Sequence, residues 1–237
     1  MRIITWNCNM AFRKKADFIL AYKPDILVVP ECEHPDKLIF PIDTPKPTDT
    51  LWFGKNKNKG LAIFSYSDYR FTVLENHDEN LRMIIPIAVT NGQIEFTLFA
   101  IWAYNPFDIN YKYVGQIWKA VHYYESSLTG RNIILAGDFN SNVIWDKLHR
   151  KVSHSMLVEK LASLNIFSTY HTHSNSAQGV EQHPTLYMYR HQNKPYHIDY
   201  CFASKDLLDK ISSVEIGDYD TWIKYSDHVP VIITFGN

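Results

Sequence analysis

The sequence predicts an α/β fold with two packed sheets, and three observations support this prediction. Short apolar runs rich in β-branched residues recur along the whole 237-residue chain. Amphipathic helical patterns lie between some of these runs. Neither an internal repeat nor a linker interrupts them. We therefore expect one domain over residues 1–237, since a chain of this length buries roughly 70–75% of its unfolded surface around one core.

Eight apolar runs are predicted to be strands, because each is short and is bounded by Gly, Pro, Asn or Asp. They cover residues 3–6, 25–29, 61–64, 83–89, 94–102, 133–136, 197–202 and 229–235. Helices are expected at 11–22, 111–128 and 155–164. Pro24 is expected to stop the first helix, Gly130 to cap the end of the second, and Ser155 to cap the start of the third. The polar stretches 41–50 and 171–184 are expected to be loops.

Composition and charge narrow the class of protein. The chain is 46% hydrophobic and 21% charged, its net charge is −1, and its pI is near 6.8. This balance does not indicate a nucleic-acid partner, although a locally positive groove or bound metal ions would still allow one. Cys8, Cys32 and Cys201 form no C-x-x-C pair, which argues against a disulfide framework and fits a reducing compartment. Without a signal peptide or a long apolar run, we expect a cytoplasmic monomer with no membrane contact.

The stretch 132-NIILAGDFNSN-142 places Asp138 and Asn140 where an apolar strand should end. A turn would explain this pattern, and so would a site. Two other predicted strands also end on polar residues, namely Asn7 and Glu31. Polar residues at several strand ends can converge at one edge of a packed sheet, where α/β folds tend to place their chemistry.

Further polar residues flank the last predicted strands. His197 and Asp199 are two residues apart and are expected to share a strand face. Asp227 and His228 immediately precede the final strand. Carboxylates and asparagine oxygens without thiolates suit Mg²⁺ or Mn²⁺, and a histidine that an aspartate can orient suits acid–base catalysis. Together they predict hydrolysis of a phosphate ester. Each residue alone is better explained by a turn, a loop or the first turn of a helix, but the set of five positions favours a site.

The short motifs WN, PE, GDFN, IDY and SDH occur in that order between residues 6 and 228. Together they resemble the endonuclease/exonuclease/phosphatase superfamily, which includes deoxyribonucleases, abasic-site endonucleases, inositol-polyphosphate phosphatases and sphingomyelinases. The resemblance covers nearly the whole chain. It implies a DNase I-like, four-layer α/β/β/α sandwich with two central mixed sheets and a site at one end.

The same resemblance implies the catalytic roles. Asp138 would position or activate the attacking water, and Asn140 would hold a phosphate oxygen. His228, oriented by Asp199, would exchange a proton with the phosphate group. The reaction would be in-line attack on phosphorus without a covalent enzyme intermediate.

The resemblance also implies the metal ligands and reveals one departure. Glu31 would be the main ligand of Mg²⁺ or Mn²⁺, helped by Asn7 and Asp227. Abasic-site nucleases commonly carry an acid two positions after WN, but this chain carries Asn9. We expect Asn9 to contact substrate, and its presence weakens any second metal position there.

A second departure concerns the end of the strand at 94–102. The family has a His or Tyr at this point that contacts the phosphate, and this chain offers Trp102 with Tyr104 beside it. An indole N–H donates a hydrogen bond but cannot transfer a proton. Trp102 and Tyr104 are therefore substrate-binding candidates, and the acid for the leaving group is not assigned.

Several other residues have two interpretations each. His171 and His173 alternate as they would on a strand face; without cysteines at ligand spacing, a substrate-lining or solvent-exposed loop is favoured over a zinc site. The basic run 54-GKNKNKG-60 is either a phosphate contact or a solvated hairpin turn. Arg190 either contacts substrate phosphate or lies on the surface. Trp222 is expected to be a buried indole rather than a DNA contact.

Two functions remain open from the sequence. One is a metal-dependent nuclease or phosphodiesterase that acts on nucleic acid, and the other is a phosphatase or phosphodiesterase for a small phosphate ester. A binding scaffold without activity is disfavoured, because the acidic residues and the histidine of the motifs are all present. Substrate choice depends on loops that carry no readable signal.

Overall fold

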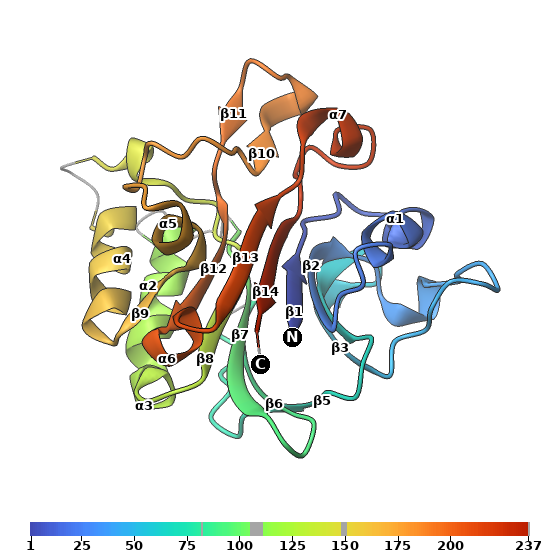
Figure 1. Cartoon of the computed structure of the whole chain (residues 1–237), viewed down its shortest axis with the longest axis horizontal. Coiled ribbons are helices and arrows are strands. Elements are labelled where there is room, and N and C mark those ends of the chain that lie inside the picture. Colours follow the sequence, from blue (N-terminus) through green and yellow to red (C-terminus); the bar gives the residue numbers. More distant parts are fainter. Residues whose placement is uncertain (82, 105–110, 148–150, 237) are drawn as a thin grey trace.

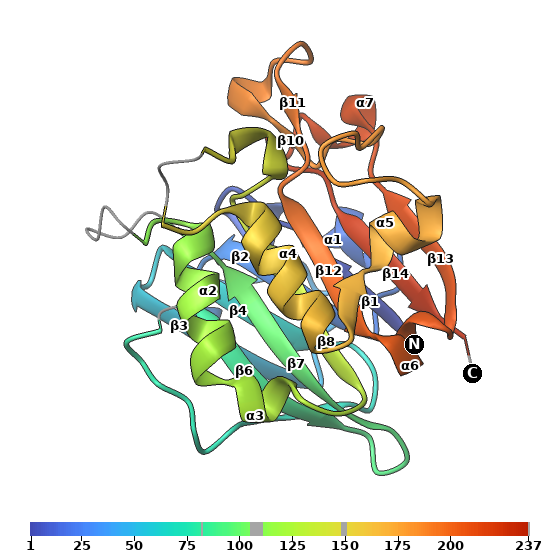
Figure 2. The ribbon, with the colours of Figure 1, turned by 90° about the vertical axis from the view of Figure 1, so that its left-hand side faces the viewer.

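The computed structural model describes residues 1–81, 83–104, 111–147 and 151–236. Two six-stranded sheets pack face to face, with helices on their outer faces (Figures 1 and 2). In Figure 1, α2 (Val114–Tyr123) and α4 (His154–Ser163) cover one side, and α1 (Ala16–Leu20) covers the other. This arrangement confirms the predicted four-layer α/β/β/α sandwich.

Both sheets are mixed. Sheet 1 has the order β13 (Ile211–Ile216), β14 (Val231–Phe235), β1 (Arg2–Thr5), β2 (Ile26–Cys32), β4 (Lys59–Ser65), β3 (Asp49–Asn56). Sheet 2 has the order β5 (Arg70–Val73), β6 (Ile84–Thr90), β7 (Glu95–Trp102), β8 (Ile133–Asp138), β12 (Asp199–Ser204), β9 (Ile166–Ser168). β1 and β2 pair in parallel, as do β7 and β8. The carboxyl ends of β2 and β8 therefore deliver Glu31 and Asp138.

The remaining elements are short. The strands β10 (Leu186–Tyr187) and β11 (Pro195–Tyr196) form a separate hairpin, which projects beyond one end of the sandwich in Figure 1. The other helices are α3 (Glu125–Leu128), α5 (Thr169–Ser174), α6 (Lys205–Leu208) and α7 (Tyr219–Trp222), with 3₁₀ turns at Phe12–Lys14, Pro35–Lys37, Val143–Trp145 and Met188–Arg190. Across the described parts of the chain, every helix is too short or too polar to cross a bilayer.

Three apolar layers hold the sandwich together. Between the sheets, Val28 of sheet 1 and Leu98 of sheet 2 belong to one fully buried cluster. A second cluster joins sheet 2 to α2 and α4 through residues such as Leu161. A third joins sheet 1 to α1 and α7 and contains Trp6 and Trp222. Trp222 is buried, as predicted. Three apolar interfaces between four layers explain why both sheets are rich in apolar residues on both faces.

The eight predicted strands are present, with their ends shifted by a few residues. The helix expected at 11–22 is shorter, because a 3₁₀ turn precedes α1 and Lys15 between them is not helical. The helix expected at 111–128 is divided into α2 and α3, with the break at Tyr124. The cap predicted for α4 is wrong: Ser153, not Ser155, accepts a hydrogen bond from the backbone N–H of Met156.

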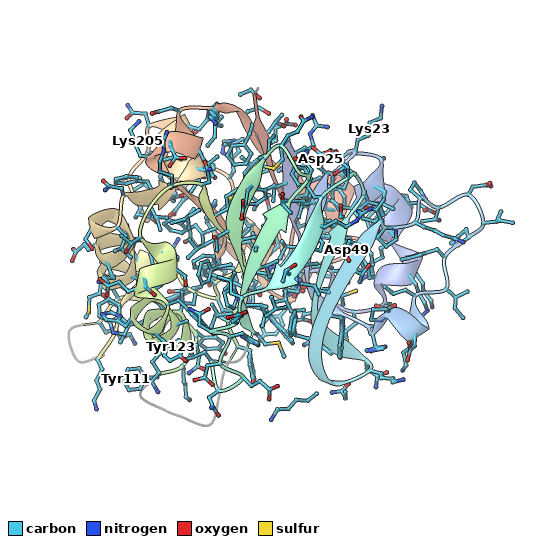
Figure 3. All side chains as sticks on the ribbon, turned by 90° about the horizontal axis from the view of Figure 1, so that it is seen from below. Lys23, Asp25, Asp49, Tyr111, Tyr123 and Lys205 are labelled. Carbon is cyan, nitrogen blue, oxygen red and sulfur yellow. The ribbon has the colours of Figure 1, made fainter. Side chains whose placement is uncertain are left out.

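Figure 3 shows the end of the sandwich that is opposite the carboxyl ends of β2 and β8, and Asp25 and Asp49 are labelled there. The Asp25 carboxylate accepts a hydrogen bond from the backbone N–H of Arg2 at 2.6 Å. The Asp49 carboxylate accepts one from the backbone N–H of Phe71 at 2.8 Å. Carboxylates at this end satisfy strand backbone, whereas those at the other end converge on one another.

Candidate active site

Three strand ends from both sheets meet through Asn7, which follows β1. Its Nδ2 atom donates to Oδ2 of Asp138 at 3.0 Å and lies 3.3 Å from Oε1 of Glu31. Glu31 belongs to sheet 1, and Asp138 ends β8 of sheet 2. Both Asn7 and Asp138 are almost fully buried. The predicted convergence of polar residues at one edge is therefore observed.

Asp138 is held in one position by its neighbours. Its Oδ1 atom accepts from the backbone N–H of Asn140 at 2.9 Å, and its Oδ2 atom accepts from Nδ2 of Asn140 at 3.0 Å. Just before it, Gly137 has φ +149°, and a Cβ atom there would lie 1.8 Å from the carbonyl oxygen of Ile101. Only glycine fits this close approach of β8 to β7. The stretch is therefore a turn that also places Asp138 among the polar residues at this edge of the sheet.

The amide of Asn140 is engaged with protein atoms. Besides its bond to Asp138, its Nδ2 atom donates to the carbonyl oxygen of Ala103 at 2.6 Å. Its backbone is left-handed, with φ 47°, which asparagine tolerates better than most residues. In this arrangement Asn140 orients Asp138, and its contact with a phosphate oxygen stays a prediction.

Asp199 and His228 form a buried pair beside Asp138. The Nδ1 atom of His228 donates to Oδ2 of Asp199 at 2.8 Å. The backbone N–H of Asp199 donates to Oγ1 of Thr185 at 2.9 Å, which fixes the start of β12. One ligand atom each from Asp138, Asp199 and His228 lies within 4.8 Å of the others. The three side chains therefore form one compact polar cluster.

Burial and charge shift the pKa values in this cluster. Burial, with the negative charge of Asp199, raises the pKa of Asp138 to about 7, against the opposing effect of His228. Burial alone would lower the pKa of His228, but the charge and hydrogen bond of Asp199, followed by the charge of Asp138, raise it to about 10. These shifts favour the protonated form of His228 at neutral pH and bring the pKa of Asp138 close to neutrality.

Glu31 has an unusual backbone. The register between β2 and β4 shifts between Pro30 and Cys32, so Glu31 is a β-bulge, and its φ is +64°. Bulges redirect a side chain at the end of a strand, and positive φ in a residue other than glycine is strained. Here the bulge turns the Glu31 carboxylate toward Asn7 and toward Lys59, whose Nζ atom lies 2.9 Å from Oε2.

Asp227 joins the group through Asn9. The Nδ2 atom of Asn9 donates to Oδ1 of Asp227 at 2.9 Å, and its backbone N–H donates to Oδ1 of Asn7 at 3.0 Å. The amide oxygen of Asn7 therefore faces Asn9, and its NH₂ group faces the carboxylates of Glu31 and Asp138. Asn7 would have to turn its amide over to bind a metal ion through oxygen, so that role stays a prediction.

The WN and SDH motifs are joined directly. Nε1 of the buried Trp6 donates to the carbonyl oxygen of His228 at 3.0 Å. Oγ of Ser226 donates to the carbonyl oxygen of Asn7 at 2.8 Å. Both bonds join residues that lie near opposite ends of the sequence. They bring the first strand and the segment before the last strand together at the site.

The donor set suits a hard divalent cation. Four carboxylates gather here, and in the part of the chain that the structure describes only two of them are in direct contact with a cationic side chain. They are the side chains of Glu31, Asp138, Asp199 and Asp227, with His228 and Lys59. The buried Oδ1 atom of Asp199 has no hydrogen-bond partner among the described residues. Oxygen donors with this charge match Mg²⁺ or Mn²⁺.

Trp102 and Tyr104 lie beside this group. Trp102 is opposite Asp138 in the pairing of β7 with β8, and its side chain is only 9% exposed. The ring of Tyr104 is tilted against it, with centroids 5.7 Å apart. Trp102 therefore belongs mainly to the core under the site, and its predicted contact with substrate is not tested by this packing.

Other predicted residues lie elsewhere. His171 and His173 are in helix α5, so their expected placement on a strand face is wrong. Nε2 of His171 donates a hydrogen bond to Oε1 of Glu181 at 3.0 Å. The guanidinium of Arg190 donates to the carbonyl oxygens of Ile223 and Lys224. These contacts join His171 and Arg190 to neighbouring segments of the chain rather than to the Asp138 cluster.

His197 does not share a strand face with Asp199, which corrects a second expectation. It precedes β12, and its Nδ1 atom lies 2.7 Å from the carbonyl oxygen of His183. Its ring packs against Tyr200, with centroids 4.9 Å apart, whereas Asp199 points to His228. The two side chains therefore leave the chain on different sides.

A pocket of about 310 Å³ adjoins the cluster at Asn140. Aromatic and apolar side chains form much of its wall, including Tyr113, Trp145 and Met188. Trp145 lies in a short 3₁₀ turn that follows Asn140 along the chain. These lining residues were not predicted, because isolated aromatic residues in loops carry no periodic signal.

Comparison with known structures agrees with this fold. Similar structures include a 3′-5′ exonuclease, NExo, from Neisseria meningitidis, with 22% identity, a TM-score of 0.67 and full coverage of both chains. An AP endonuclease from Archaeoglobus fulgidus has 20% identity and a TM-score of 0.67, with 99% of each chain covered. The AP endonuclease LMAP from Leishmania major has 15% identity and a TM-score of 0.68, with 100% of this chain and 87% of that one covered.

At these identities the structural matches establish the fold alone. No curated protein sequence matches the chain. The model of the Endonuclease/Exonuclease/phosphatase family matches residues 4–228, which include all five short motifs. The chain therefore belongs to the endonuclease/exonuclease/phosphatase family and is a hydrolase of phosphate ester bonds.

Proposed function

We propose that this protein is a divalent-metal-dependent nuclease or phosphodiesterase that hydrolyses phosphodiester bonds in nucleic acid. The observation that carries the proposal is the cluster of Asp138, Asp199 and His228, with its ligand atoms within 4.8 Å of one another, linked through Asn7 to Glu31. The similar structures support nucleic acid as substrate, because they include AP endonucleases and a 3′ phosphatase bound to a product DNA hairpin.

Glu31 and Asp227 would hold Mg²⁺ or Mn²⁺, with Asn7 beside them. When bound, the ion would offset negative charge on the phosphate and on the leaving oxygen. The protein supplies the frame for this site through the bulge at Glu31 and the bond from Asn9 to Asp227. Because the bulge fixes the backbone at Glu31, reorganisation on binding would be confined to side chains, namely those of Lys59 and Asn7.

Asp138 would take a proton from the attacking water. A general base works best when its pKa lies near the operating pH, and burial raises that of Asp138 to about 7. Three hydrogen bonds from Asn7 and Asn140 fix the direction of its oxygens. Protonated His228, held by Asp199, would donate a hydrogen bond to a phosphate oxygen.

A second candidate function is hydrolysis of a small phosphate ester. The net charge of −1 gives no general attraction to nucleic acid. The pocket of about 310 Å³ next to Asn140, with Tyr113 and Trp145 in its wall, has the size and aromatic character to take one nucleoside. A free nucleotide would fill it as well as one nucleotide of a strand.

The test uses a panel of substrates with Mg²⁺ and with EDTA. The panel contains supercoiled plasmid, linear duplex, an abasic-site oligonucleotide, mononucleotides and an inositol phosphate. We expect cleavage of a nucleic acid that EDTA abolishes, with binding that weakens steeply as salt rises. Turnover of the small esters alone, by folded and metal-loaded protein, would instead establish the second function.

A further inference from the structure

Lys59 contacts the site, although no family motif contains it. Its Nζ atom lies 2.9 Å from Oε2 of Glu31. Lys59 is the first residue of β4 and follows the turn of the β3–β4 hairpin, where it pairs with Asn56. The basic run at 54–60 is thus a hairpin turn, and its last lysine reaches the carboxylate expected to hold the metal.

The backbone determines this contact. Pro30 pairs with Leu61 and Cys32 pairs with Gly60, so the bulged Glu31 lies across from the start of β4. A lysine at position 59 is therefore beside Glu31 wherever the hairpin forms. The contact between Lys59 and Glu31 follows from the register of the two strands. It therefore differs from an ion pair between two mobile side chains on the surface.

The surroundings of Lys59 also differ from those of its neighbour Lys57. The Lys59 side chain is 38% exposed, and its partner Glu31 is 18% exposed. Its Nζ atom is 5.3 Å from the ring centroid of Trp102, within reach of a cation–π interaction. Lys57, in the same turn, is 61% exposed and pairs with the surface residue Asp36. Of these two lysines, Lys59 lies among the candidate site residues and Lys57 does not.

The Glu31 carboxylate has two oxygens with different partners. Oε1 faces Nδ2 of Asn7, and Oε2 is taken by Lys59. A divalent cation at Oε2 would meet the ammonium at close range, where two like charges repel strongly. The four-carbon stem of lysine lets the ammonium move aside while the backbone of β4 stays in place.

We propose that Lys59 is the internal counter-ion of Glu31, that it competes with a divalent ion for this carboxylate, and that the displaced ammonium contacts a substrate phosphate. This inference rests on the proposed function, because it takes Glu31 as a metal ligand. It assigns Lys59 as a residue that sets metal affinity and substrate binding.

The test measures Mn²⁺ affinity by electron paramagnetic resonance, without turnover. The variants are Lys59→Met, Lys59→Arg, Glu31→Gln and the matched control Lys57→Met, each checked for wild-type folding by circular dichroism. We expect Lys59→Met to bind Mn²⁺ about tenfold more tightly, because the competing charge is gone. Lys59→Arg and Lys57→Met should stay within about twofold of wild type. At saturating Mn²⁺, Lys59→Met should raise KM for the cleaved substrate with little change in kcat.

The outcomes separate this inference from the proposed function. If wild type binds Mn²⁺ no better than Glu31→Gln, the metal site of the proposed function is wrong. If wild type binds Mn²⁺ through Glu31 but Lys59→Met has unchanged or weaker affinity, only the role of Lys59 is overturned. A tighter Lys59→Met variant with an unchanged KM overturns the substrate contact and retains the competition.

Discussion

Nδ1 of His228 lies 2.8 Å from Oδ2 of Asp199, and both side chains are buried. A buried imidazolium needs a nearby carboxylate, and a carboxylate bonded to Nδ1 fixes which ring nitrogen faces the substrate. The pair therefore explains why the IDY and SDH motifs occur together, although 29 residues separate the two side chains.

Replacing Asp199 by asparagine should remove the negative charge that stabilises protonated His228, while a side chain of similar size keeps the space filled. A neutral amide cannot compensate the charge of His228, so the histidine loses its proton and its fixed direction. We expect kcat/KM for the best nucleic-acid substrate to fall by about 100-fold or more. Asp36→Asn, which alters a surface carboxylate paired with Lys57, should change kcat/KM by less than about twofold. Equal activities of the two variants would contradict the role of Asp199.

Gly137→Ala should destabilise the fold next to the site. The added Cβ would lie 1.8 Å from the carbonyl oxygen of Ile101, so β7 and β8 must separate. We expect the free energy of unfolding to drop by roughly 3 kcal/mol or more. Gly92→Ala is the matched control, since Gly92 also has positive φ but open space around it. That change should cost about 1–2 kcal/mol, and urea unfolding measures both.

Buried His154 should contribute to a loss of stability in acid. Burial lowers the pKa of His154 to about 4 from its ordinary 6.5, so the unfolded chain binds this proton first. Between pH 6.5 and 4 the unfolded chain therefore binds a proton at His154 that the folded protein does not, so the contribution of His154 to the free energy of unfolding decreases as pH falls through this window. His154→Asn should reduce the slope by up to roughly 1.4 kcal/mol per pH unit. Urea unfolding at several pH values checks this, and identical slopes would contradict it.

Glu31 should contribute to activity at a cost in stability, because its side chain requires a strained backbone. Its left-handed backbone, with φ +64°, is comfortable for glycine and strained for glutamate or glutamine. Glu31→Gly and Glu31→Gln both remove the charge, so both should lose most of the metal-dependent activity. Glu31→Gly should nevertheless be more stable than Glu31→Gln by about 1 kcal/mol. A less stable glycine variant would mean that the bulge carries no strain.

Much of the candidate site could be predicted, because the ends of strands can be recognised in the sequence. Apolar runs that end on Glu31 and Asp138 indicate which residues reach the edge of a sheet, and the ordered motifs predict that these edges coincide. The fold class followed from the same runs. Helix positions were also readable where an apolar face was wide, as in α2 and α4.

The features that were missed depend on long-range pairing. Lys59 faces Glu31 only because a bulge shifts the register of β2 on β4, and nothing local to either strand indicates that shift. His171 and His173 alternate as in a strand, yet Ser168 caps a helix there by accepting from the backbone N–H of His171. Strand β13 is partly exposed on both faces, so its pattern was too weak to recognise.

The most direct test of the account is the rate of Mg²⁺-dependent cleavage by wild type and by Asp138→Asn. Both proteins must first show the same thermal unfolding and the same Mn²⁺ affinity, so that a loss of rate reports on chemistry. The account predicts a fall in kcat of roughly 100- to 10,000-fold, because the amide cannot take a proton from water. A variant within about tenfold of wild type would contradict the central claim that Asp138 is the general base.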